Sequence, residues 1–388
     1  MDLNYGINGF IAEDAARPIV TESSTPIAII SDCSVGDIGI QSFQSADSAL
    51  EVLGNTACGS LKQALDMISL QGVNCPIIVG LVRTAEDMKA NIIDTIDTMT
   101  RAEALTGFRP DLIISPNHSF DVDIAARLDA AAAKLLGTAI VDNLAADETA
   151  AKAWAENFSS RNLLIYGPCA KYYDTKSAAN VGVGASAAIA AMIARTDGEV
   201  RYGFADSISN RVVKGITGTQ RNAGPLPVDA ILAEQIIEYA DGQDCEARRL
   251  RQAGIGSIVA DEGWRTYGFE TTDIDPIWQA LERVRTFTKA LRAIQKASKW
   301  ARDRRANELL EVRKSVDAFM RELKGNNVAL GFDIFFDPLK NTNATVTAGI
   351  FYLTVKWQNM SLIRELNIEM VYTDDYGSVL LNMINGGN

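Results

Sequence analysis

Short apolar runs alternate with amphipathic helical stretches through most of this chain, and this alternation limits its fold more than any other feature. Apolar runs of a few residues without polar alternation are typical of a sheet that helices cover on both faces. The order strand, helix, strand favours parallel pairing. We therefore predict one extended α/β region over residues 26–272, with strands near 27–30, 76–82, 111–116, 138–142 and 162–166.

The character of the sequence changes after residue 272, where long charged helices replace the short apolar runs. Helices are predicted at 276–300 and 306–323, followed by strands near 328–336, 346–357 and 363–373. A turn-forming stretch at 337–341 joins the first two of these strands. The predicted division is an arm at 1–25, an N-terminal α/β part at 26–100, a central α/β domain at 101–272, a C-terminal α+β domain with a three-stranded antiparallel meander at 273–373, and an arm at 374–388.

Both arms carry apolar residues that no core of their own can cover. The first alternates weakly before it becomes polar, and the last contains one short strand-like run after an acidic turn. Unpaired strands are an aggregation hazard unless the sheet edge of another chain receives them. We predict strand exchange between subunits through Leu3, Tyr5, Ile7, Val379, Leu381 and Met383.

The helix at 283–302 holds seven basic residues and no acidic one, although the whole chain has a net charge of -12. At about 100° per residue, five of these cations fall within about 80° of one another, with apolar residues on the far side. The rest of the chain carries -19, which is -12 minus the +7 of this helix. A basic stripe on an acidic protein predicts an acidic partner, bound through Arg285, Lys289, Arg292, Lys296 and Lys299.

Composition argues against several kinds of site. A single histidine, His118, excludes a metal site of several imidazoles and leaves one candidate base for a Ser/His/Asp triad. The five cysteines are odd in number and form no CxxC pair, as in a protein with reduced thiols. No signal peptide or membrane span is evident. We expect no catalytic residues, cofactor or metal, and no membrane span.

Two alternatives stay open. Residues 182–187 fit GxGxxA before a helix, so Gly182 and Gly184 could serve a nucleotide-dependent α/β enzyme, although the preceding strand lies about fifteen residues too early. The basic stripe could instead bind DNA, but it lacks interleaved aromatic residues and the surrounding charge repels phosphate. We therefore expect no nucleic-acid partner.

The ordered motifs of the chain resemble those of the contractile tail sheath proteins of bacteriophages and R-type bacteriocins. The matching runs are STPI at 24–27, GSL at 59–61, PIIV at 76–79, TGFRPD at 106–111, ARTDG at 194–198, LRQAGIGSI at 250–258 and GWRTYGFET at 263–271. The last run departs from the family pattern at Tyr267 and Glu270, and the loops near Gly167 and Asp206 depart from it more.

This resemblance implies a subtilisin-like central layer without proteolysis and a structural role in a virion tail. In such a sheath, hexameric rings stack around a tube, terminal arms add strands to neighbouring subunits, and contraction drives the tube through the host envelope. The implied partners are other copies of the chain, the acidic face of the tube protein, and the baseplate and tail terminator at the two ends. The family attaches its tube through a helix that matches residues 285–299 here. Assembly is implied to occur in the host cytoplasm.

Overall fold

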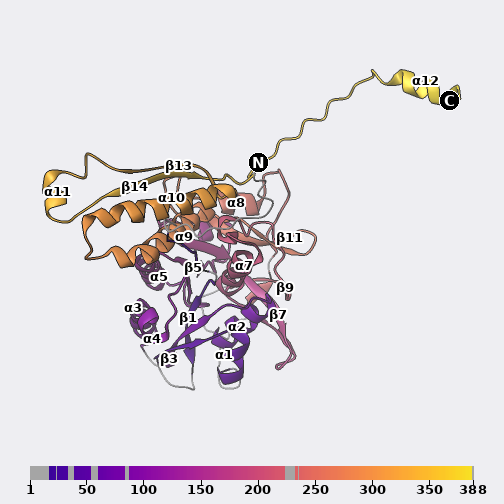
Figure 1. Cartoon of the computed structure of the whole chain (residues 1–388). Coiled ribbons are helices and arrows are strands. Elements are labelled where there is room, and N and C mark those ends of the chain that lie inside the picture. Colours follow the sequence, from indigo (N-terminus) through magenta and orange to yellow (C-terminus); the bar gives the residue numbers. More distant parts are fainter. Residues whose placement is uncertain are drawn as a thin grey trace, which may run out of the picture.

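Among the residues that a computed structural model describes, eight strands form one central sheet (Figure 1). The described residues are 17–22, 24–33, 39–53, 60–83, 87–222, 232–234 and 236–386. The strand order is β12-β11-β6-β5-β4-β1-β3-β2, with parallel inner pairs and antiparallel edge strands β2 and β12. The bounds are β1 Ile27–Cys33, β2 Gly39–Phe43, β3 Ile77–Arg83, β4 Leu112–Ile114, β5 Thr138–Asp142, β6 Leu163–Gly167, β11 Ile255–Ala260 and β12 Trp264–Tyr267.

Helices cover both faces of this sheet. Because successive strand residues point to opposite faces, Ile27 and Ile29 of β1 join one core and Ala28 and Ile30 join the other. The first core is closed by α1 Ala46–Leu53, α2 Ser60–Leu70 and α7 Ala185–Glu199. The second is closed by α3 Met88–Met99, α5 Val122–Leu135, α6 Glu148–Ala155 and α8 Glu246–Gln252, with the short α4 Ala102–Thr106 following α3. The predicted α/β class with parallel strands is confirmed.

A second, four-stranded antiparallel sheet has the order β10-β9-β7-β8, which the apolar pattern did not predict. Its strands are β7 Cys169–Asp174, β8 Ala179–Val183, β9 Ile216–Asn222 and β10 Leu232–Glu234. The predicted division at residue 100 falls within the large sheet, because β1 pairs with β3 on one side and with β4 on the other. The two predicted α/β parts therefore share one sheet.

The C-terminal part packs two long helices against a β-hairpin. Its elements are α9 Leu281–Ser298, η2 Lys299–Ala301, η3 Ala306–Glu308, α10 Leu309–Gly325, β13 Ala329–Phe336, α11 Asn343–Thr347 and β14 Leu353–Asn359. Buried Val316, Phe319 and Met320 of α10 form its core with partly buried Phe332 and Ile334 of β13. We call β13, β14 and their connection the hairpin.

The predicted three-stranded meander is wrong for the isolated chain, since residues 361–373 form no strand. They form an extended linker that leads to α12 Gly377–Ile384, and the outer part of this linker projects away from the body (Figure 1). In the single chain Val379, Leu381 and Met383 are helical and exposed, which differs from the strand-like run expected from the sequence. Strand exchange between subunits through these residues stays a prediction. Without a sheet edge to pair with, a short apolar segment satisfies its backbone groups internally as a helix. The predicted Leu3, Tyr5 and Ile7 lie outside the described residues.

Candidate assembly sites

The residues predicted to bind a tube lie on α9, and the structure divides them into two groups. Arg285, Lys289 and Arg292 are each no more than 4% exposed. The prediction that these three line an exposed basic face is wrong. Lys296 and Lys299 are exposed as expected. A helical pattern shows which residues share a face, but it does not show that distant carboxylates cover part of that face.

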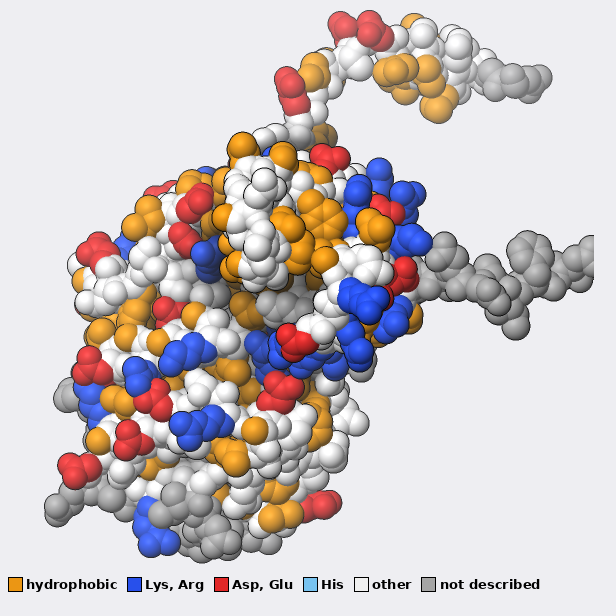
Figure 2. Space-filling view, turned by 60° about the vertical axis from the view of Figure 1, so that its left-hand side comes forward, with side chains coloured by type: hydrophobic (Ala, Val, Ile, Leu, Met, Phe, Trp, Pro, Cys, Tyr) orange, Lys and Arg blue, Asp and Glu red, His pale blue; other side chains and the backbone are white. Residues whose placement is uncertain are grey.

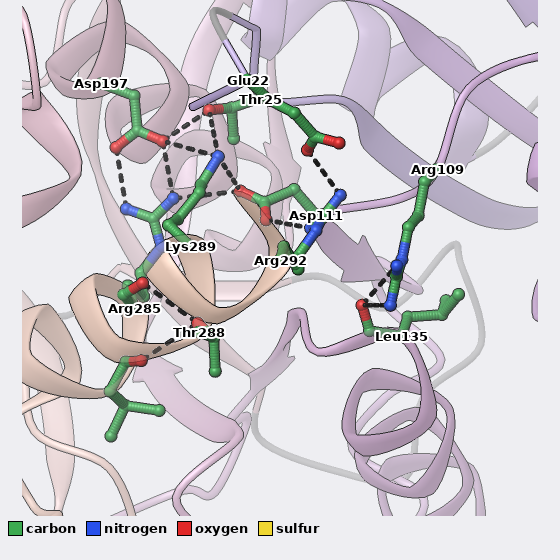
Figure 3. Close-up of polar contacts among 11 residues, drawn as sticks. Glu22, Thr25, Arg109, Asp111, Leu135, Asp197, Arg285, Thr288, Lys289 and Arg292 are labelled. Carbon is green, nitrogen blue, oxygen red and sulfur yellow. Dashed lines mark hydrogen bonds and ion pairs between the residues drawn. The ribbon is translucent and has the colours of Figure 1, made fainter. Parts of the chain in front are cut away.

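Two aspartates from distant parts of the α/β region bind these buried cations (Figure 3). Asp111 lies just before β4, and Asp197 lies near the end of α7. Arg285 binds Asp197 with both terminal nitrogens, at 2.8 Å from Nη1 to Oδ1 and 2.6 Å from Nη2 to Oδ2. The Nζ atom of Lys289 lies 2.9 Å from Oδ2 of Asp111, and Nη2 of Arg285 lies 3.1 Å from the same oxygen.

Arg292 extends these contacts to the segment before β1. Its Nη1 donates to Oδ1 of Asp111 at 2.7 Å, and its Nη2 donates to Oε2 of Glu22 at 2.6 Å. The hydroxyl of Thr25 donates to Asp197. The contacts thus join the N-terminal segment, the central sheet and α9. We call the following residues the ionic cluster: Glu22, Asp111, Asp197, Arg285, Lys289 and Arg292.

The electrostatics of the ionic cluster are balanced, with three cations facing three carboxylates. Burial raises the pKa of Asp111, but the charges of the three surrounding cations, Lys289 first, outweigh burial and hold this pKa well below its usual value. Burial lowers the pKa of Arg285, but Asp197 and Asp111 raise it above its usual value. Breaking a buried ion pair by removing one partner costs about 3 to 5 kcal/mol. The cluster therefore fixes the orientation of α9 on the sheet.

Two of the runs that resemble sheath motifs supply the acids of this cluster. The run at 106–111 supplies Asp111, and its Arg109 donates instead to the carbonyl of Leu135 at 3.1 and 2.7 Å (Figure 3). The run at 194–198 supplies Asp197. Sequence reasoning assigned neither aspartate a role. The sequence indicates only that each of the two motifs contains an aspartate. Nothing in the sequence around either residue indicates that the two side chains lie close together in the fold.

Exposed cations gather where α9 ends and in its connection to α10. Within residues 296–305 only Asp303 is acidic. No carboxylate of the described residues pairs with the exposed cations of this stretch. Figure 2 shows Lys and Arg side chains gathered beside apolar ones on the face that it presents. We call the exposed cations of residues 296–305 the basic patch: Lys296, Lys299, Arg302, Arg304 and Arg305.

The hairpin leaves both of its sheet edges open. β13 and β14 pair antiparallel with each other, and neither has a second neighbour in the described parts of the chain. In the linker, Leu366, Ile368, Met370 and Tyr372 alternate with other residues and are 71% to 92% exposed. Alternation with a period of two is the pattern of a strand with one buried face. The chain therefore combines open edges with an unpaired segment patterned as a strand.

His118 lies in the loop after β4, beside the end of β1. Its Nε2 is 3.0 Å from Oδ1 of Asp32 and 3.5 Å from the hydroxyl of Ser60, which itself donates to Asp32 at 2.9 Å. In a triad the aspartate holds one ring nitrogen and the serine uses the other. Here one nitrogen faces both groups, so the arrangement is not that of a triad. The described residues contain no cluster of His, Cys, Asp or Glu suited to a metal.

The candidate nucleotide loop is occupied by protein groups. Gly182 lies in the antiparallel β8, and Gly184 is the N-cap of α7. The buried carboxylate of Asp142 accepts from the backbone N–H of Ser186 at 2.7 Å, and Asn117 accepts from the N–H of Gly184 at 2.8 Å. A phosphate would need this helix N-terminus. Asp142 and Asn117 take that position, so the geometry does not favour the nucleotide alternative.

Comparison with known proteins agrees with this arrangement, although no family model matches the chain. The prophage major tail sheath protein of Pseudomonas aeruginosa (strain UCBPP-PA14) is 32% identical over 278 residues, covering 71% of this chain and 68% of the relative. The tail sheath protein of Escherichia phage P2 is 22% identical over an alignment of 412 positions that covers 99% of both. The sheath complex of the extracellular contractile injection system PVC, solved in its contracted state, has a TM-score of 0.70 at 13% identity, covering 97% of this chain and 100% of that one.

The fold is thus that of a contractile sheath subunit. With a relative of 32% identity over most of both sequences, the chain belongs to the tail sheath protein family. The family resemblance and the structural role predicted from the motifs are confirmed. No helix of the described residues is long and apolar enough to cross a membrane.

Proposed function

We propose that the chain polymerises as stacked hexameric rings around a tail tube and contracts to drive that tube through a host envelope. The observation that carries the proposal is that the chain has both sheet edges without a neighbouring strand and apolar segments that could pair with such edges. The hairpin has two open edges, and the chain has an apolar segment towards each end. Each copy can therefore accept as many strands as it donates, which is the condition for a continuous mesh.

The energies of two kinds of contact support contraction without loss of the sheath. A strand added to a sheet edge forms many backbone hydrogen bonds at about 0.5 to 1.5 kcal/mol net each. Exposed ion pairs contribute about 0.2 to 1 kcal/mol each. Strand exchange would therefore outlast tube attachment while subunits rearrange as rigid bodies between two packings. The proposal assigns no catalytic step to the chain.

Tube attachment is assigned to the basic patch rather than to the whole stripe. Lys296 and Lys299 are the predicted tube-binding residues that the chain exposes, and they are continuous with the three arginines after them. The predicted Arg285, Lys289 and Arg292 would serve attachment only by holding α9 in place. The partner that fits is an acidic tube surface. The sheath would meet a baseplate and a tail terminator at its ends, in a virion tail assembled in the host cytoplasm.

Electron microscopy of the purified chain tests the proposal. Hollow, helically striated cylinders are expected from the full chain. A chain truncated after Glu365, which lacks the strand-patterned part of the linker as well as α12, should remain a folded monomer without cylinders, with an unchanged far-ultraviolet circular dichroism spectrum apart from the lost helix. Cylinders from the truncated chain, or none from the full chain at high concentration, would contradict the proposal.

A further inference from the structure

The segment leading to the N-terminal arm is fastened along the second half of α9. The guanidinium of Arg17 stacks over the ring of Trp300, just after the helix, at 3.8 Å to the ring centroid. Ile19 is buried with Ala290 and Ala293 of α9. Glu22 then pairs with Arg292, as part of the ionic cluster. Residues 17–22 are therefore bound to α9 and to Trp300 just after it by three kinds of contact: a cation–π stack, apolar burial and an ion pair.

The segment leading to the C-terminal arm is fastened at the other end of the same helix. Trp357 of β14 stacks on Phe287 of α9, with ring centroids 4.3 Å apart. Asn359, which ends β14, accepts a hydrogen bond from Nε of Arg283 at 3.1 Å. Beyond the strand, Nη2 of Arg364 donates to Oε1 of Glu282 at 3.1 Å. Residues 357–364 are thus held at the first turns of α9.

The contact between Arg364 and Glu282 joins the start of the linker to the body. The Glu282 side chain is only 4% exposed, and Arg364 is its one ion-pair partner in the described residues. Arg364 also pairs with Glu270, at 2.6 Å from Nη1 to Oε1. Loss of Arg364 would leave a buried carboxylate without a counter-charge, which is costly. The linker is therefore held firmly at this point.

We propose that α9 couples the two arms mechanically, so that displacement of one arm by a neighbouring subunit is passed to the other arm through this helix. The outermost contacts, at Glu282 and Trp300, lie about 27 Å apart along the helix at 1.5 Å per residue. α9 and the short η2 that follows it span that distance, whereas the chain path between the arms runs through the whole α/β region. The ionic cluster binds the middle of α9 to Asp111 and Asp197 of the α/β region. A displacement of the helix would therefore also move the α/β region.

This inference rests on the proposed strand exchange, and Arg364→Ala tests it in particles whose sheath is assembled on its tube. The matched control is Glu369→Ala, an exposed linker residue that has no ion pair or hydrogen bond from its side chain among the described residues. The readout is the fraction of contracted sheaths that are unbroken by electron microscopy after a mild urea trigger. We expect at least a tenfold fall for Arg364→Ala, a smaller fall for Arg364→Lys, and none for Glu369→Ala.

Unbroken contraction of Arg364→Ala sheaths at the wild-type frequency would overturn the coupling role of α9. If Arg364→Ala does not assemble alone, it is mixed with wild-type chains at increasing fractions. Breaks that rise with that fraction support the inference, and a constant frequency contradicts it. Failure of the wild-type chain to form a sheath would instead contradict the proposed function, so the two failures are distinguishable.

Discussion

Arg285 and Asp197 lie 88 positions apart in the chain and form a buried bidentate ion pair, with nitrogen to oxygen distances of 2.8 and 2.6 Å. This pair joins the C-terminal part to the last turn of α7. It also explains why a strongly basic helix belongs in an acidic protein: part of its charge is neutralised within the subunit. The exposed positive charges that remain available to a partner are those of Lys296 and the cations that follow it.

The first prediction concerns the central acid of the ionic cluster. Asp111→Asn leaves three buried cations facing two carboxylates, so the free energy of unfolding should fall by about 3 to 5 kcal/mol. Urea unfolding followed by circular dichroism measures this change. The matched control is Asp94→Asn on α3, an exposed carboxylate that forms no ion pair or side-chain hydrogen bond within the described parts of the chain, which should change stability by no more than about 0.5 kcal/mol. Equal effects of the two substitutions would contradict the role of the cluster.

The second prediction follows from the lowered pKa of Asp111. A carboxylate whose pKa is lower in the folded state contributes stability that is fully present above its unfolded pKa and is lost as pH falls through its folded pKa. The unfolded value is near 3.8. The unfolding free energy of the wild type should therefore decrease progressively below about pH 5. Asp111→Asn should show a shallower decrease, and parallel curves would count against this explanation.

The third prediction addresses tube attachment. Lys296→Glu combined with Lys299→Glu reverses two exposed charges, so attachment to an acidic tube should weaken by about 1 to 4 kcal/mol per subunit. Sheath formation should persist. Co-sedimentation of sheath with tube at low and high salt measures the effect, which salt should reduce. Lys134→Glu, an exposed cation of α5, is the control, and unchanged attachment of the double variant at low salt would reject this assignment.

The fourth prediction concerns the glycine at the start of α7. A methyl group on Gly184 would lie 2.2 Å from Oδ2 of Asp142, which is tightly held. Gly184→Ala should therefore destabilise the fold by about 1 to 3 kcal/mol. Gly198→Ala, in the same helix but with open space around it, should be neutral or stabilising by up to about 1 kcal/mol. Thermal unfolding compares the two, and a nucleotide that stabilised wild-type protein in the same assay would reopen the alternative function.

The sequence predicted most of the large sheet because its strands are short apolar runs with helices between them. It did not predict the second sheet, since strands such as β8 Ala179–Val183 and β9 Ile216–Asn222 contain no continuous run of large apolar residues. The third meander strand was predicted at residues 363–373, where apolar side chains alternate around Ile368. Such alternation indicates which side chains favour burial in a sheet. It does not indicate whether the neighbouring strand belongs to the same chain or to another subunit.

The ionic cluster was beyond sequence reasoning for a related reason. The helical phase correctly grouped Arg285, Lys289 and Arg292 on one face. Whether that face meets water or carboxylates depends on contacts with Asp111 and Asp197, which lie 174 and 88 positions from Arg285. A single sequence gives the net charge of the chain and the sign of the charge in each segment. Ion pairs between distant residues decide how much of that charge is left unpaired at the surface.

The open edges of the hairpin also bear on when a sheath starts to grow. A subunit that already displays both an unpaired strand segment and the edges to receive one needs no activating event, because its adhesive surfaces are exposed in the free monomer. The onset of polymerisation is then governed by concentration and by nucleation. A lag phase that shortens when preformed ends are added would be its kinetic signature.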